Sequence, residues 1–159
     1  MRIHSERGFT LIELLIITII VGVLGTLVAV TYSGVKVKNR NAARQLDIDT
    51  IQSQLETYYA QYTKYPSLVE LNNASWRKSN LKDLPGDSIQ DPSWSKKISD
   101  CTVKGTVTLA AKPAAKCYSY QATTTDGSAC TAANVTCTQY TLTATLEGKG
   151  DKYVKSSLN

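Results

Sequence analysis

The sequence predicts an α+β protein in which one long N-terminal α-helix packs on a small C-terminal antiparallel β-sheet. Three observations support this fold class: an uncharged apolar stretch from Leu14 to Val35, an amphipathic pattern that follows it to Tyr62, and short threonine- and tyrosine-rich segments after Cys101. The chain has 159 residues, which leaves room for one small domain beyond its apolar end. Its net charge is +5.

The first part of the helix, residues 9–35, is apolar, and no charged residue follows Glu13 within it. It is long enough to cross about 30 Å of hydrocarbon, so we expect a transmembrane helix. A secretory signal peptide would place its cleavage site after the apolar run, whereas the candidate site here, between Gly8 and Phe9, precedes it. Residues 1–8 are therefore predicted to be a leader, and the apolar helix is kept after the leader is removed.

Residues 36–64 are expected to continue the same helix in amphipathic form. A basic collar comes first, formed by Lys36, Lys38, Arg40 and Arg44. Apolar side chains then recur at spacings of three and four, and they draw one stripe along the helix: Ile48, Ile51, Leu55, Tyr58 and Tyr62. This stripe is the predicted partner of the apolar face of the sheet.

Residues 65–100 are predicted to connect the long helix to the sheet through a loop that contains one short helix. Pro66 ends the long helix, because the residue before a proline avoids helical geometry. Ser67 and Glu70 form an S-x-x-E capping box, which predicts a helix from Leu68 to about Ala74. The following stretch contains prolines and a glycine and is expected to be an irregular surface loop.

Residues 101–159 are predicted to form the antiparallel sheet. Strands are expected in TVKGTVTL, CYSYQA, QYTLTATLE and KYVK, with turns at Asp126–Gly127 and at Gly148–Gly150. In the third of these segments apolar residues alternate with threonines, which predicts a half-buried strand with a solvated threonine face.

The four cysteines, Cys101, Cys117, Cys130 and Cys137, all lie in this part of the chain. Their separations are not those of a zinc site, and an exported domain favours disulfides. Four cysteines allow three pairings, and the sequence does not choose among them. We prefer Cys101–Cys117 with Cys130–Cys137, because each bond closes a short loop.

The sequence contains none of the common catalytic or phosphate-binding patterns. There is no Ser/His/Asp, Cys/His or phosphate-loop pattern, and the single histidine, His4, lies in the expected leader. We therefore expect no enzymatic activity, no cofactor and no metal.

The N-terminal residues closely resemble the processing site of type IV pilins and type II secretion pseudopilins. The residues that carry this resemblance are Arg7, Gly8, Phe9, Thr10, Leu11, Ile12, Glu13, Leu14 and Leu15. More loosely, the resemblance covers the whole chain and implies a pilin-like fold. It also implies that prepilin peptidase cuts between Gly8 and Phe9, that Phe9 is then N-methylated, and that the subunits stack into a helical filament. Some major pseudopilins bind calcium in a loop comparable to the one with Asp83, Asp87 and Asp91, but a solvated polar loop is favoured here.

Glu13 is an acidic residue within the apolar run, where a carboxylate costs about 2.5 to 3.5 kcal/mol. Cleavage would create an α-amine at Phe9, which is largely charged at neutral pH because its reference pKa is about 7.7. The two groups could pair within one helix, whereas the resemblance implies pairing with the amine of a neighbouring subunit. The alternative is a glutamate that only stabilises the N-terminus of the helix.

The expected function is that of a structural subunit of a type IV pilus-like extracellular filament. The alternatives are a pseudopilin of a type II secretion system, or a DNA-uptake or adhesive pilin whose lysines capture polyanions. Those lysines are Lys96, Lys97, Lys104, Lys112 and Lys116. The implied partners are copies of the chain and other pilins, prepilin peptidase, the inner-membrane pilus or secretion machinery, and lipid before assembly. The precursor is expected in the cytoplasmic membrane as a single-pass protein, and the mature subunit in a cell-surface filament.

Overall fold

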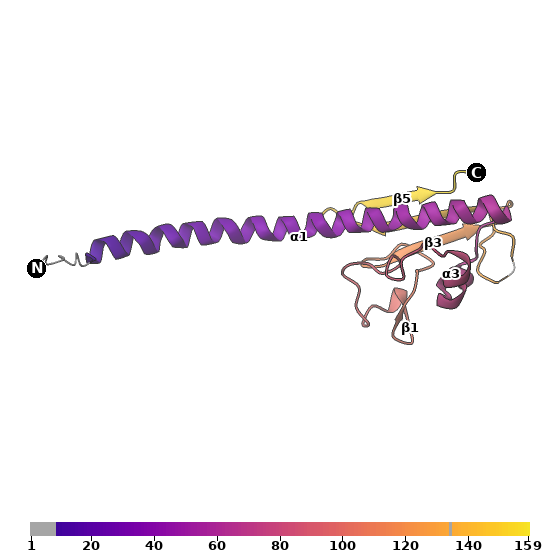
Figure 1. Ribbon diagram of the computed structural model, residues 1–159, viewed down its shortest axis with the longest axis horizontal. Helices are drawn as coiled ribbons and strands as arrows, with labels where there is room; N and C mark the ends of the chain where they lie inside the picture. Colours follow the sequence, from indigo (N-terminus) through magenta and orange to yellow (C-terminus); the bar gives the residue numbers. More distant parts are fainter. Residues whose placement is uncertain (1–8, 134) are drawn as a thin grey trace, which may run out of the picture. The chain divides into compact units, whose positions relative to one another are not determined.

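The computed structural model describes residues 9–133 and 135–159, and the chain divides into two compact units, residues 1–38 and 39–159. The elements are those of the predicted α+β class, and Figure 1 shows them in chain order by colour. The helices are α1 (Leu11–Tyr62), α2 (Leu68–Asn72) and α3 (Ala74–Asn80), with a 3₁₀ turn at Ser99–Cys101. The strands are β1 (Thr102–Val103), β2 (Thr106–Val107), β3 (Tyr118–Thr123), β4 (Gln139–Thr145) and β5 (Lys152–Ser156).

Helix α1 is continuous through the apolar and amphipathic segments, as the sequence predicted. It ends two residues earlier than expected, because Thr63 adopts a left-handed backbone conformation with φ of 53°. The chain then turns toward the sheet, where the Tyr65 N–H donates to the carbonyl of Cys137 at 2.9 Å.

The connection after α1 contains two short helices rather than one. The capping box of α2 is present: the Glu70 N–H donates to Ser67 Oγ, and the Glu70 carboxylate accepts from the Ser67 N–H at 2.8 Å. Helix α3 was not predicted. It begins because the side chain of Asn73 accepts a hydrogen bond from the Trp76 N–H at 3.1 Å, which makes Asn73 a second N-cap directly after α2.

Strands β3, β4 and β5 form an antiparallel sheet in that order. The predicted strand TVKGTVTL is instead a tight hairpin of two-residue strands, β1 and β2. Its turn residues Lys104 and Gly105 both have positive φ, 50° and 77°, as two-residue hairpin turns with the twist of the strands require. The threonine face of β4 is not fully solvated either, since only 3% of Thr143 is exposed.

The core lies between α1 and the three-stranded sheet. The predicted stripe is confirmed at four positions, because Ile48, Ile51 and Leu55 are fully buried and Tyr58 nearly so, whereas Tyr62 is 44% exposed. The sheet contributes its buried apolar and aromatic side chains, among them Tyr118, Tyr120, Tyr140, Leu142 and Ala144.

Both preferred disulfides are present, Cys101–Cys117 and Cys130–Cys137. The first closes a small lobe of the domain with its own apolar cluster, in which Cys101, Ala110 and Cys117 contact Trp94, Ile98 and Ala114. We refer to residues 94–117 as the disulfide lobe. The lobe includes the β1–β2 hairpin.

Each strand of the main sheet is tied to an acidic residue of α1 by a tyrosine. The pairs are Tyr118 to Asp47 at 2.6 Å, Tyr140 to Glu56 at 2.7 Å and Tyr153 to Asp49 at 2.9 Å. Burial raises the pKa of Tyr118 and of Tyr140 well above the usual value, so both hydroxyls stay protonated and donate. The sheet is therefore held on α1 by hydrogen bonds to three acidic residues in addition to the apolar stripe.

Arg44 lies at the centre of a buried ion-pair network. Its guanidinium is fully buried and binds Asp91 in bidentate fashion, with Nε to Oδ2 at 2.7 Å and Nη2 to Oδ1 at 2.9 Å. Nη2 also donates to Glu147 Oε1 at 2.7 Å. The structure therefore corrects the expectation of a solvated loop at Asp91, and it shows that Arg44, unlike the exposed Lys36 and Lys38 of the collar, is buried.

Glu147 joins the turn between β4 and β5 to the same region of α1. Besides Arg44, it accepts from Arg40 Nε at 2.8 Å and from Ser93 Oγ at 3.0 Å. Its backbone N–H donates to Asn41 Oδ1 at 2.9 Å. The hydrogen bonds from Arg40 and Arg44 hold the pKa of Glu147 well below its usual range. We call Arg40, Arg44, Asp91 and Glu147 the arginine clamp.

We predict that Arg44→Met lowers the free energy of unfolding by about 3 to 5 kcal/mol, because it leaves the Asp91 carboxylate buried without its partner. Urea unfolding of the detergent-solubilised full chain, followed by tryptophan fluorescence, measures this. Lys38→Met, which removes an exposed basic residue of the same helix, is the control and should change stability by less than about 0.5 kcal/mol. Equal free energies of unfolding for the two variants would contradict the stabilising role of the arginine clamp.

We also predict a pH-dependent effect of Glu147→Gln. The folded-state pKa of Glu147 lies below its unfolded value, so the stability from its ionisation is present above about pH 4.3 and is lost as the pH falls through the folded-state pKa. The variant should be less stable than the wild type at pH 7, and the difference should shrink below about pH 4. A stability difference that is the same at pH 7 and pH 3 would refute this; Asp151→Asn is the matched control.

Candidate functional site

The predicted assembly residues lie at the start of α1. Phe9 is 74% exposed, and the helix begins two residues later. Thr10 Oγ1 accepts from the Glu13 N–H at 3.3 Å, and the Thr10 carbonyl accepts from the Leu14 N–H at 3.2 Å, so Thr10 caps the helix. Glu13 is exposed in the first turn, where the helix dipole favours an acid. Gly8 lies outside the described residues.

The beginning of α1 exposes apolar side chains on every side. From Leu11 to Thr26 each residue is exposed, including Leu11 at 84%, Ile12 at 66% and Leu24 at 56%. An apolar surface of this extent needs lipid or protein to cover it. Within the described part of the chain, no helix meets the combined length and apolarity needed to cross a membrane. The transmembrane segment expected at 9–35 therefore stays a prediction.

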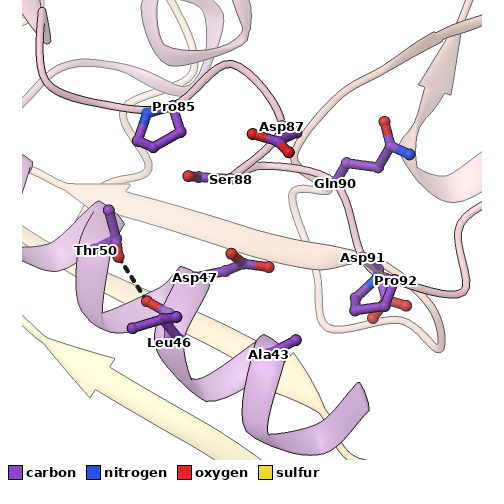
Figure 2. A pocket seen from close by; sticks show the side chains of 10 residues that line it. All are labelled: Ala43, Leu46, Asp47, Thr50, Pro85, Asp87, Ser88, Gln90, Asp91 and Pro92. Atoms are coloured by element: carbon purple, nitrogen blue, oxygen red, sulfur yellow. Dashed lines mark hydrogen bonds between the residues drawn. The ribbon is translucent and has the colours of Figure 1, made fainter. Parts of the chain in front are cut away.

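We refer to the second unit, residues 39–159, as the head. A groove opens on the head between α1 and the connection that precedes the disulfide lobe. It has a volume of about 450 Å³, and its helix side is formed by Ala43, Leu46, Asp47 and Thr50. Its other side is formed by Pro85, Asp87, Ser88, Gln90, Asp91 and Pro92. Figure 2 shows Asp47 on the helix, with the segment that carries Asp87 and Asp91 across from it. We call this the α1 groove.

The α1 groove combines apolar and acidic groups. Leu46 is 67% exposed in it, although it is an apolar residue of the helix. Burial is the main cause that raises the pKa of Asp47, the nearby Asp87 and Asp91 raise it further, and the hydrogen bond from Tyr118 opposes them. Asp91 is neutralised by Arg44, whereas no ion pair to Asp87 is found among the described residues. The groove is thus suited to an occupant that has both apolar and cationic groups.

The five lysines considered for polyanion binding, Lys96, Lys97, Lys104, Lys112 and Lys116, are all exposed, and all lie in the disulfide lobe. None of them takes part in a salt bridge to any residue in the described ranges. The three loop aspartates do not come together: Asp87 and Asp91 line the groove, but Asp83 does not. Among the described residues, no group of three or more His, Cys, Asp or Glu side chains is placed to hold a metal ion.

Comparison with known proteins agrees with the N-terminal motif. The prokaryotic N-terminal methylation motif matches residues 3–29. Type II secretion system core protein G of Dickeya chrysanthemi is 33% identical over 88 residues, 55% of this chain and 58% of that protein. The protein of the same name from Pectobacterium carotovorum subsp. carotovorum is 36% identical over 82 residues, 52% and 53% of the two chains.

Core protein G of Escherichia coli (strain K12) is 33% identical over 96 residues, 52% of this chain and 66% of that protein. The matches thus span roughly half to two thirds of the length of these relatives. No solved structure matches the chain significantly. By its methylation motif, these relatives and its long helix packed on a small antiparallel sheet, the chain is similar to type IV pilins and type II secretion pseudopilins.

Proposed function

We propose that this protein is a pseudopilin, a structural subunit of the filament of a type II secretion system. The observation that carries the proposal is the methylation motif at residues 3–29, which includes the beginning of α1, where the apolar side chains from Leu11 to Leu24 are exposed. The relatives named core protein G support the secretion alternative better than the type IV pilus that the sequence suggested as the first choice.

Maturation is proposed to remove residues 1–8. Prepilin peptidase would hydrolyse the bond between Gly8 and Phe9, and the new α-amine of Phe9 would be N-methylated, a change that keeps its positive charge. The exposure of Phe9 and the start of α1 at Leu11 support this step, because the described side of the bond is accessible and lies outside the helix.

Assembly is proposed to depend on Glu13 and the α-amine of Phe9. In an apolar surrounding an unpaired carboxylate is unfavourable by about 2.5 to 3.5 kcal/mol, so Glu13 needs a cation. Copies that stack through the beginning of α1 would cover its exposed apolar side chains and bring Glu13 to the amine of a neighbouring subunit. The ion pair then favours one axial position of the neighbour, whereas apolar contact alone would accept several.

The protein is proposed to act through assembly and not through catalysis, with no cofactor. Its partners would be copies of itself, other pseudopilins, prepilin peptidase and the inner-membrane secretion machinery. The precursor would reside in the cytoplasmic membrane as a single-pass protein, and lipid would cover the apolar helix there until a neighbouring subunit replaces it. The oxidising side of that membrane is where the two disulfides of the head would form.

We predict that Glu13→Gln lowers the yield of sheared or pelleted filament by at least about tenfold, because the amide cannot neutralise the Phe9 amine. Mass spectrometry should still find a mature subunit that begins at Phe9, so the defect lies after cleavage. Glu6→Gln is the control, since residue 6 is removed with the leader, and its filament yield should equal that of the wild type. Normal filaments from Glu13→Gln would contradict the pairing role.

We further predict that deleting the gene stops export of secreted proteins while surface pili remain. Quantitative proteomics of the culture medium and electron microscopy of the cell surface measure the two outcomes. Loss of surface pili with unchanged export would instead identify the chain as a pilus subunit.

A further inference from the structure

The α1 groove and the tip of the β1–β2 hairpin have complementary surfaces. Leu46 provides an exposed apolar side chain on the helix side of the groove, and Pro85 and Pro92 lie on the other side. Asp47 and Asp87 supply one carboxylate from each side (Figure 2). With a volume of about 450 Å³, the groove has room for a few side chains.

The hairpin tip carries the matching groups on a rigid support. Val103 is 59% exposed, and Lys104 is exposed at the turn with φ of 50°. The disulfide at Cys101 anchors the base of the hairpin, and the Thr108 N–H donates to the Cys101 carbonyl at 2.9 Å. A rigid tip loses little conformational entropy when it docks.

The charges of the two surfaces are opposite. The disulfide lobe holds five lysines and one acidic residue, Asp100, which gives a net charge of +4. In the groove, Asp91 is neutralised by Arg44, so Asp47 and Asp87 are the acids left to attract a cation. The pKa of Asp47 is raised mainly by burial, which means that its ionised form lacks hydration that a cation could replace.

We propose that the Val103–Lys104 tip of one copy docks in the α1 groove of a second copy, with the Lys104 amine between Asp87 and Asp47 and with Val103 against Leu46. This inference rests on the proposed filament function. It identifies one contact between the heads of two copies in the filament. The two surfaces are different parts of the same chain, so the contact is heterologous. Repeated from copy to copy, a heterologous contact gives a ring if its rotation closes and an open helical polymer if it does not, and the proposed filament corresponds to the open case.

Zero-length cross-linking of wild-type filaments tests the contact directly. A carbodiimide joins an amine to a carboxylate only where the two touch, and it leaves no spacer. We expect dimers and larger species on a denaturing gel, with Lys104 linked to Asp87 or Asp47 by mass spectrometry. Cross-linked dimers in which Lys104 is absent from every linked peptide would overturn the proposal.

A charge exchange provides the second test. Lys104→Asp and Asp87→Lys should each lower filament yield by about tenfold, and the double variant should yield clearly more filament than either single variant, because the ion pair between positions 104 and 87 returns with its signs reversed while Asp47 stays acidic. Lys112→Asp and Asp83→Lys, in the same lobe and the same connection but away from the contact, are the matched controls and should assemble normally. Unchanged thermal unfolding of each solubilised variant shows that the fold is intact.

Three outcomes separate this proposal from its alternatives. If Glu13→Gln abolishes filaments but both single charge variants assemble like the wild type, the filament function stands and the hairpin contact is wrong. If Lys104→Asp leaves filaments intact but removes salt-sensitive binding of duplex DNA to them, the lysines form a polyanion surface, which also overturns the proposal. If Glu13→Gln filaments are normal, the assembly mechanism itself fails.

Discussion

Arg44 connects three segments of the head through one fully buried guanidinium. It binds Asp91, 47 residues later, and Glu147, 103 residues later, so the connection after α3 and the turn before β5 meet on one turn of α1. A buried charge is tolerated only when its partners are in place, and each of these partners fixes the backbone that carries it. The α1 groove depends on this arrangement, because Asp91 and Pro92 form part of its wall.

The tyrosines of the sheet add orientation to the apolar contact. Hydrophobic packing of the α1 stripe is not directional and would accept small shifts of the sheet along the helix. Hydrogen bonds from Tyr118, Tyr140 and Tyr153 to three carboxylates of α1 remove that freedom, because each bond requires one position of its strand. The same bonds explain why acidic residues lie next to the stripe, where the sequence pattern alone indicates solvent.

The two units of the chain have opposite relations to their surroundings. The head satisfies its apolar groups internally, with Ile48, Ile51 and Leu55 fully buried, whereas the described apolar side chains at the start of α1 are all exposed. A chain of this kind is incomplete as a monomer, because the apolar side chains at the start of α1 are left for lipid or for further copies to cover. In the proposed function, membrane lipid covers these side chains first, and neighbouring subunits of the filament cover them after assembly.

The sequence by itself determined the local features: the course of α1, the capping box at Ser67, the strands β3 to β5 and the N-terminal motif. These features depend on periodicity, caps and turns within a few residues. The preference for disulfides that close short loops also agreed with the observed pairing, Cys101–Cys117 and Cys130–Cys137. The tertiary structure decided that Arg44 and Asp91 are buried partners, that Asp47 and Asp87 share a groove, and that Lys104 stands at a hairpin tip. Such contacts join residues far apart in the chain, and nothing in the local pattern of an arginine or an aspartate shows which distant charge will neutralise it when both are buried.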